Sequence, residues 1–222
     1  TLGGAVVIDT TGSSAGNIVF SSTIATGDNN LTLDAGTAGN VTLSGALTGG
    51  GAMTVRDGEV QSYAVLTVDS LTISDATTSV TLNGALTADG AVDIDSGGTI
   101  AINAAINTNS SASGTIAIDG DGTTTIAAAG DINAGGAVSF GAAKSGTLTT
   151  SGDIVTSNDN ITFTRAVTLG GNVDIDTTGS SDGNILFSST IATAGNNLTL
   201  DARTAGNVTL SGALTGKGAM TV

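Results

Sequence analysis

The residues of this chain that could do chemistry are almost all carboxylates. It has 19 Asp and Glu residues against five Lys and Arg, and it has no His and no Cys. Without those two residue types, nucleophilic triads and most zinc sites are excluded. Cleavage of a polysaccharide would need clustered acids beside cations that stabilise developing charge, and five basic residues offer little of this. We therefore expect that the chain is not an enzyme.

Calcium binding is the chemistry that remains open to the carboxylates, because Ca²⁺ prefers oxygen ligands. Residues 118–122 read Ile-Asp-Gly-Asp-Gly, like the beginning of a calcium loop. The later acids and the closing Glu of a helix–loop–helix site are missing, as is the glycine-rich nonapeptide of calcium-binding toxins. The sequence predicts no complete metal site. Asp95, Asp119 and Asp121 are the candidate ligands if carboxylates stacked on one another share a calcium ion.

The overall charge limits the partners of the chain. The formal net charge is −14, and so acidic a surface repels the phosphates of nucleic acids and anionic lipids. No apolar run approaches the ~20 residues of a membrane helix, so we expect no membrane insertion. The lack of cysteine excludes a small disulfide-stapled domain but not secretion.

The elements that must position these side chains are short β-strands. Helical periodicity is missing, and triplets of the form apolar–x–apolar recur instead, as in Val41, Leu43, Leu47, Met53 and Val55. In a strand, residues two apart share a face, so each triplet sends two side chains inward and one outward. Gly, Asn, Asp and Ser fill the intervals, as sharp corners require.

This pattern predicts an all-β fold, a parallel β-solenoid of about 21 residues per coil and about ten coils. The preference of parallel crossovers predicts right-handed coils. Repeated immunoglobulin-like sandwiches are disfavoured, because their modules run to about 100 residues. The expected coil starts are Ile18, Val41, Leu66, Val80, Ile100, Thr124, Leu148, Val167 and Ile185.

A much longer repeat is superimposed on the coils. Residues 1–55 return as residues 168–222 with 47 of 55 positions identical. Residues 1–222 are therefore expected to form one continuous solenoid segment, with 1–167 as one full long repeat and 168–222 as the start of the next. The expected starts divide the long repeat into about eight coils. A chain that begins and ends within the pattern is expected to be part of a longer protein.

Three kinds of polar residue occupy fixed places in the pattern. Asn17, Asn40, Asn184 and Asn207 each precede a triplet, and we expect them to form hydrogen-bonded ladders along the axis. Acids that follow a strand are expected to cap turns through nearby backbone groups: Asp9, Asp34, Asp95, Asp119, Asp176 and Asp201. Thr is expected at the outward position of many triplets: Thr32, Thr42, Thr54, Thr67, Thr72, Thr81, Thr162, Thr199, Thr209 and Thr221. One outward Thr per strand is fewer than the two of a flat ice-binding grid.

Residues 39–55, Gly-Asn-Val-Thr-Leu-Ser-Gly-Ala-Leu-Thr-Gly-Gly-Gly-Ala-Met-Thr-Val, resemble the shaft repeats of filamentous-haemagglutinin-like adhesins and the strand repeats of autotransporter passengers. The resemblance covers essentially the whole chain at the level of pattern, and no site residue carries over. It implies a large secreted bacterial protein whose rod is displayed at the cell surface. Attachment to a host or neighbouring cell would then lie in other parts of the protein.

The expected function is that of a rigid shaft segment of such a fibre or adhesin. The alternative is a segment of a self-assembling extracellular filament, sheath or surface layer, in which copies of the chain contact one another. A glycan-binding module is a third possibility. It would need a platform of exposed aromatic side chains, and Tyr63 is the one aromatic expected at the surface.

Overall fold

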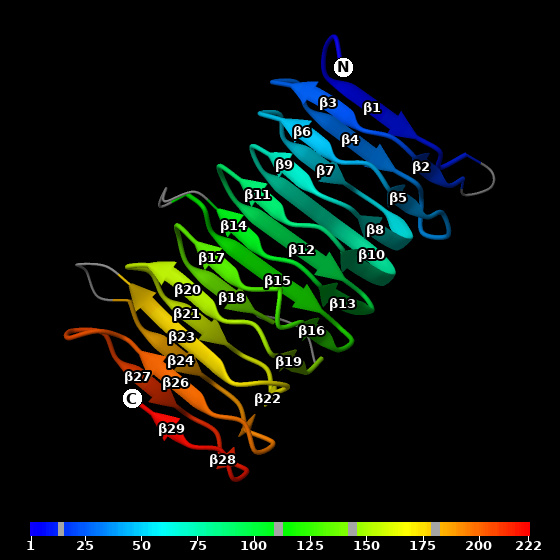
Figure 1. The fold of residues 1–222 in the computed structure, drawn as a ribbon. Coiled ribbons are helices and arrows are strands. Elements are labelled where there is room, and N and C mark those ends of the chain that lie inside the picture. The colour runs from blue at the N-terminus through cyan, green and yellow to red at the C-terminus, as the bar shows by residue number, and fades with distance from the viewer. Residues whose placement is uncertain (13–15, 109–112, 142–145, 179–182) are drawn as a thin grey trace.

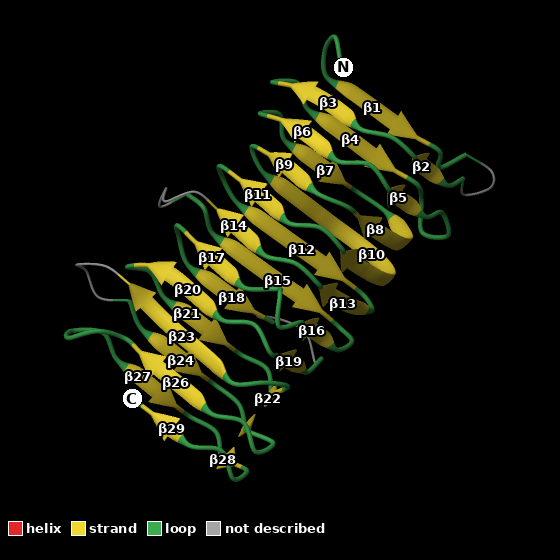
Figure 2. Cartoon of the chain, viewed as in Figure 1, coloured by secondary structure: helices red, strands yellow, loops and turns green. Residues whose placement is uncertain are grey.

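The computed structural model describes residues 1–12, 16–108, 113–141, 146–178 and 183–222. They form a right-handed parallel β-solenoid of about nine coils of roughly 22 residues, without helices (Figures 1 and 2). The coils are stacked along one axis, with the N-terminus at one end and the C-terminus at the other. The predicted fold class is confirmed, including its parallel pairing and right-handed coils.

The strands form three parallel ladders that run along the stack of coils, and we number the ladders in chain order. The first ladder contains β1 (Val6–Asp9), β4 (Leu31–Asp34), β7 (Met53–Val55), the beginning of β10 (Leu71–Leu82), β12 (Val92–Ser96), β15 (Ile116–Gly120), β18 (Val138–Phe140), β21 (Ile161–Phe163), β24 (Ile185–Phe187) and β27 (Val208–Leu210).

The second ladder contains β2 (Ile18–Phe20), β5 (Val41–Leu43), β8 (Gly58–Tyr63), the end of β10, β13 (Thr99–Ile102), β16 (Thr124–Ile126), β19 (Leu148–Thr150), β22 (Val167–Leu169), β25 (Ile191–Ala192) and β28 (Leu214–Thr215). Because β10 runs through the corner between the first two ladders, these two ladders form one 19-stranded sheet.

The third ladder is a separate ten-stranded sheet. It contains β3 (Ile24–Gly27), β6 (Leu47–Gly49), β9 (Leu66–Val68), β11 (Leu86–Ala88), β14 (Ile106–Thr108), β17 (Ile132–Ala134), β20 (Ile154–Ser157), β23 (Val173–Thr178), β26 (Leu198–Asp201) and β29 (Met220–Thr221).

The core is a narrow, mainly aliphatic column, made by the alternation within each strand. In β5, for example, Val41 and Leu43 are buried while Thr42 between them is only partly buried. Every Thr that the sequence places outward is partly or fully exposed, so the inward and outward assignment is confirmed. Stacked coils of the same register bring like residues together, as where Met53 lies between Leu31 and Leu71. The absence of proline fits this arrangement, because inner strands donate hydrogen bonds along the whole stack.

Two of the expected coil starts are wrong. Leu66 lies in the third ladder and pairs with Leu47 and Leu86, and Ile185 lies in the first ladder and pairs with Ile161. Every strand has the same inward–outward pattern, so the pattern does not specify which of the three ladders a strand joins. Variable lengths of the corners decide that, and they shift the phase of the template.

Candidate functional site

The candidate calcium ligands lie at the corner between the first and second ladders. Asp95 and Asp119 occupy neighbouring positions of β12 and β15, so their carboxylates are on successive coils. Asp121 follows two residues later, where its backbone amide donates to the carbonyl of Ser96. Among the described residues, no three acidic groups lie close enough to hold a metal ion together. The structure therefore brings two candidates together as a stacked pair, and calcium binding stays a prediction.

A cation that the sequence did not single out lies beside this pair. The side chain of Arg165 is 1% exposed, and its Nη2 is 3.9 Å from Oδ1 of Asp119. Its Nη1 donates to the hydroxyl of Thr124 at 3.0 Å. Desolvation lowers the pKa of Arg165, while the charges of Asp119 and Asp121 act in the opposite direction. The carboxylates thus face a buried guanidinium, which partly neutralises the corner that calcium would need.

Gly141 makes room for this arginine. Its φ is +75°, in the left-handed region, and a Cβ built on it would collide with the guanidinium of Arg165. Only glycine satisfies both requirements at no cost. The pattern of the sequence gives no sign of this pair, because the two residues are 24 positions apart and belong to corners rather than strands.

Neighbouring acidic residues also repel each other at two places on the solenoid. Burial, with the charges of Asp119 and Asp95, raises the pKa of Asp93. Burial, with the charges of Asp34 and Asp75, likewise raises the pKa of Asp57. Ionised carboxylates at these two places oppose folding, so their protonation favours the folded state.

In the second copy of the long repeat, an arginine relieves such a contact. Asp176 and Asp201 are neighbours in register. Nη2 of Arg203 donates to Asp176 at 3.0 Å, and Nη1 lies 3.7 Å from Asp201. The equivalent pair of the first copy, Asp9 and Asp34, is also in register, but Gly36 stands where Arg203 stands here.

Turn capping is confirmed for three of the six acids. Oδ1 of Asp9 accepts hydrogen bonds from the amide and hydroxyl of Thr11, Asp34 accepts from the amide of Gly36, and Asp201 accepts from the amide of Arg203. These hydrogen bonds lower the pKa of Asp9. Each acid accepts from the amide two residues ahead, the arrangement of an Asx turn.

The predicted asparagine ladders are present. Oδ1 of Asn17 accepts the backbone amide of Asn40 at 2.9 Å, one coil away. Oδ1 of Asn184 accepts the backbone amide of Asn207 at 2.9 Å and its side-chain amide at 3.1 Å. Asn160 extends this second ladder by one coil, with its Oδ1 accepting both amides of Asn184. The ladders satisfy backbone donors at the points where strands begin.

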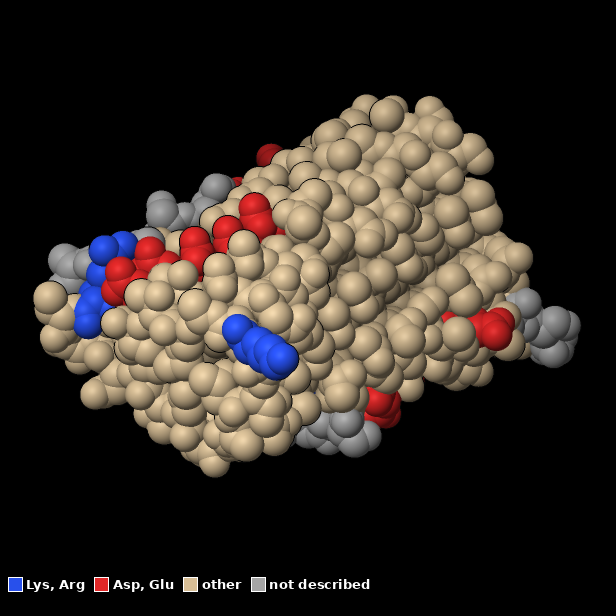
Figure 3. Space-filling view, turned by 60° about the horizontal axis from the view of Figure 1, so that its bottom comes forward, with Lys and Arg blue, Asp and Glu red and all other residues tan. Residues whose placement is uncertain are grey.

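Aspartates form an equivalent ladder on the third face, which the sequence analysis missed. Oδ1 of Asp131 accepts the amide of Asp153 at 2.9 Å, and Oδ1 of Asp153 accepts the amide of Asp174 at 2.8 Å. Asp accepts through the same Oδ1 atom as Asn. The position of these aspartates relative to their strands is therefore the sequence signal that could have predicted this ladder. Figure 3 shows acidic side chains in a row along one side of the molecule, with a basic group at one end of the row.

The expectation for Tyr63 is wrong. Its side chain is fully buried, and its hydroxyl donates to Oε1 of Gln61 at 2.6 Å inside the core. Burial raises the pKa of Tyr63 well above its usual value. Tyr63 follows Gln61 by two residues in β8, so both point inward. The aromatic side chains are therefore buried or, for Phe20, half-buried, and they offer no platform for a sugar ring.

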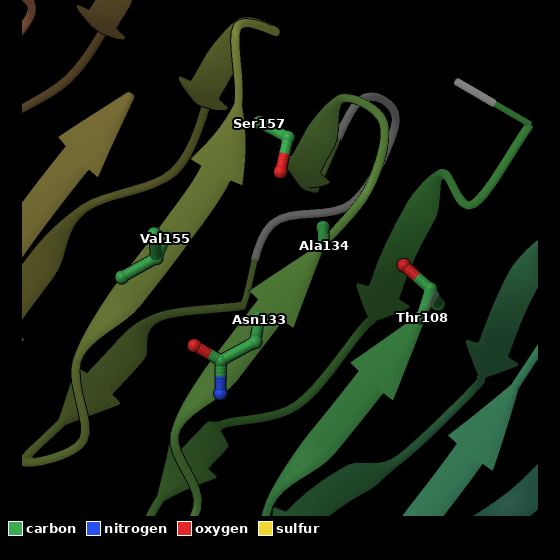
Figure 4. Close-up of a pocket in the computed structure, with 5 residues that line it drawn as sticks. All are labelled: Thr108, Asn133, Ala134, Val155 and Ser157. Atoms are coloured by element: carbon green, nitrogen blue, oxygen red, sulfur yellow. The ribbon is translucent and has the colours of Figure 1, made fainter. Parts of the chain in front are cut away.

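A shallow depression of about 190 Å³ lies over β14, β17 and β20 (Figure 4). Its lining is made of Thr108, Asn133, Ala134, Val155 and Ser157. The fold already uses its polar groups, since Thr108 donates to the carbonyl of Gly114 at 2.6 Å and Asn133 donates to Asn107 at 3.1 Å. The lining contains no titratable side chain.

Comparisons of this chain with protein-family models, curated proteins and solved structures find no match. The described chain also contains no helix that could cross a membrane.

Proposed function

We propose that this chain is a rigid shaft segment of a large, secreted bacterial surface fibre or adhesin. Three uninterrupted ladders and one continuous aliphatic column carry the proposal. Each coil is bonded to the next through all three ladders, which opposes bending, and stability adds up along the axis as it does in other repeat proteins.

The polar groups of the surface support a mechanical role over a catalytic one. The asparagine and aspartate side chains of the ladders are bonded to the next coil, and three of the acids after strands cap their own turns. The hydrogen bonds of these side chains therefore hold neighbouring coils and turns together. We propose no catalytic step, and attachment to a cell or host is assigned to other parts of the protein.

The surface location rests on the resemblance of the repeats and on composition. A net charge of −14 keeps a long rod soluble and apart from other anionic polymers. Labelling of intact source cells with an antibody against this chain tests this part of the proposal. We expect labelling without permeabilisation, and a signal that requires permeabilised cells would contradict it.

The shaft itself is tested by adding length. We would compare the 222-residue chain with chains lengthened by one and two further copies of residues 1–167, using small-angle scattering and sedimentation. A shaft stays monomeric at every concentration and grows by about 37 Å per copy, from the ~4.8 Å spacing of neighbouring strands. Polymers that form with rising concentration would instead support the filament alternative.

The effect of calcium on the chain would be measured separately. Sedimentation and unfolding would be measured with added calcium and with a chelator, for the chain and for Asp119→Asn. A midpoint of unfolding that rises with calcium in the chain but not in the variant would assign a calcium site to the corner of Asp95, Asp119 and Asp121. Equal midpoints would remove calcium from the proposal.

A further inference from the structure

The two copies of the long repeat occupy different faces of the solenoid. β1 lies in the first ladder, whereas its sequence equivalent β23 lies in the third. β2 and β5 lie in the second ladder, and their equivalents β24 and β27 lie in the first. β3 and β6 lie in the third ladder, and their equivalents β25 and β28 lie in the second. β4 and β7 follow the same rule, with β26 and β29 as their equivalents.

The shift measures the long repeat in coils. β1 is the first strand of the first ladder, and β23 is the eighth strand of the third ladder. The long repeat therefore advances by about seven and two-thirds coils, not by the eight that the sequence predicted. Each repeat begins one third of a coil out of phase with the one before it.

Equivalent side chains do the same structural work on the new face. Asn17 and Asn40 form their ladder at the start of β2 and β5, and Asn184 and Asn207 form theirs at the start of β24 and β27, with 2.9 Å bonds in both. Phe20 pairs with Leu43 in the second ladder, and Phe187 pairs with the equivalent Leu210 in the first. The same strand sequence can thus occupy different faces of the solenoid and make equivalent contacts there.

We propose that the long repeat carries each surface feature to all three faces in turn. Where long repeats follow one another, a site present once per repeat recurs about 37 Å further along and one third of a coil around the axis. It returns to the same face only after three repeats, or about 110 Å. The shaft therefore presents one set of surface sites to partners on every side. A second copy lying alongside can match a given patch only at every third repeat, which opposes side-by-side bundling.

This inference rests on the pairing of strands and stands whether or not the protein is displayed at a cell surface. Cysteine pairs test it on the full chain, which has no native cysteine. Leu186 and Thr162 are outward neighbours in β24 and β21. If the long repeat contained a whole number of coils, Leu186 would instead lie in the second ladder, beside Thr168 of β22.

We expect Thr162→Cys with Leu186→Cys to form a disulfide on mild oxidation, because neighbouring parallel strands bring Cα atoms within reach. Thr168→Cys with Leu186→Cys should stay reduced. Val19→Cys with Thr42→Cys is the positive control, since these two residues are neighbours within the first copy. Cross-linking of the 168–186 pair in preference to the 162–186 pair would overturn the inference.

A second measurement tests the display of sites directly. A chain lengthened by two further copies of residues 1–167, with cysteine at every equivalent of Thr42, would be labelled with small gold particles and imaged by electron microscopy. We expect successive particles to step around the rod at intervals of about 37 Å. Particles that follow one straight line parallel to the axis would overturn the proposal.

Discussion

Phe187 stacks on Phe163, with ring centroids 4.3 Å apart and ring planes 7° from parallel. Phe163 in turn stacks on Phe140 at 5.2 Å, so three rings form a column inside the first ladder. Phe20, the sequence equivalent of Phe187, has no part in it and is half-buried beside Leu43. Phe20 and Phe187 pair with the equivalent residues Leu43 and Leu210, but β2 is the first strand of its ladder, so Phe20 has no strand on its other side.

Phe187→Leu should destabilise the chain more than Phe20→Leu. Stacked aromatic pairs contribute about 0.5–1.5 kcal/mol beyond the area they bury, and the first variant loses such a pair while the second does not. Chemical unfolding of both variants measures the difference. Equal losses would mean that the column adds nothing to ordinary burial.

Val41→Asp should lower the free energy of unfolding by several kcal/mol, because it buries an unpaired carboxylate in the aliphatic column. Thr42→Asp, one residue along the same strand, should cost less than about 1 kcal/mol, because that side chain faces outward. Urea titration compares the two. Similar losses would contradict the inward and outward assignment of β5.

Gly141→Ala should be more damaging than Gly195→Ala. Both glycines have positive φ, +75° and +93°, so both variants pay backbone strain of about 1–2 kcal/mol. The new Cβ at position 195 meets nothing within 4 Å, whereas the one at position 141 meets the buried guanidinium of Arg165. The excess loss in Gly141→Ala should shrink when Arg165 is replaced by Ala in the same chain.

Asn184→Ala should cost about 1 kcal/mol or more, because the amides of Asn207 lose their acceptor in the ladder. Asn184→Asp should cost less, since Asp131 and Asp153 show that a carboxylate accepts the same backbone hydrogen bond. Thermal unfolding of the two variants ranks them. If the aspartate variant were the weaker, repulsion between its carboxylate and Oδ1 of Asn160, to which Asn184 donates, would outweigh the retained hydrogen bond.

Stability should rise as the pH falls from 7 toward the carboxylate range. The pKa values of Asp57 and Asp93 are raised in the fold, so their ionisation opposes folding above those values, and protonation removes the penalty. The lowered pKa of Asp9 acts in the opposite sense, and its contribution is lost only at more acidic pH. Asp57→Asn with Asp93→Asn should raise the midpoint of unfolding at pH 7 and flatten its rise on acidification. An unchanged pH profile in this double variant would contradict the assignment.

The sequence was informative wherever the signal is local to one strand. Alternation of Val41, Thr42 and Leu43 predicts which side chains point inward, and the place of Asn17 before a strand predicts its ladder. The ladder that a strand joins depends on the lengths of the corners between strands, which the strand pattern does not record, so the starts expected at Leu66 and Ile185 fell in other ladders. Arg165 and Tyr63 were missed for another reason. Their places depend on contacts in neighbouring strands and corners that no periodicity records.

The equivalence of the three faces sets the smallest step by which such a chain can change in length. If a coil had one obligatory face for each strand, insertions and deletions would have to come in whole coils of roughly 22 residues. In this solenoid the interchangeable unit is one strand with its corner, which is about a third as long as a coil. Recombination between misaligned repeats can therefore add or remove single strands and leave the aliphatic column and all three ladders continuous. A gene of this kind can drift in length by small increments without passing through an unfolded product.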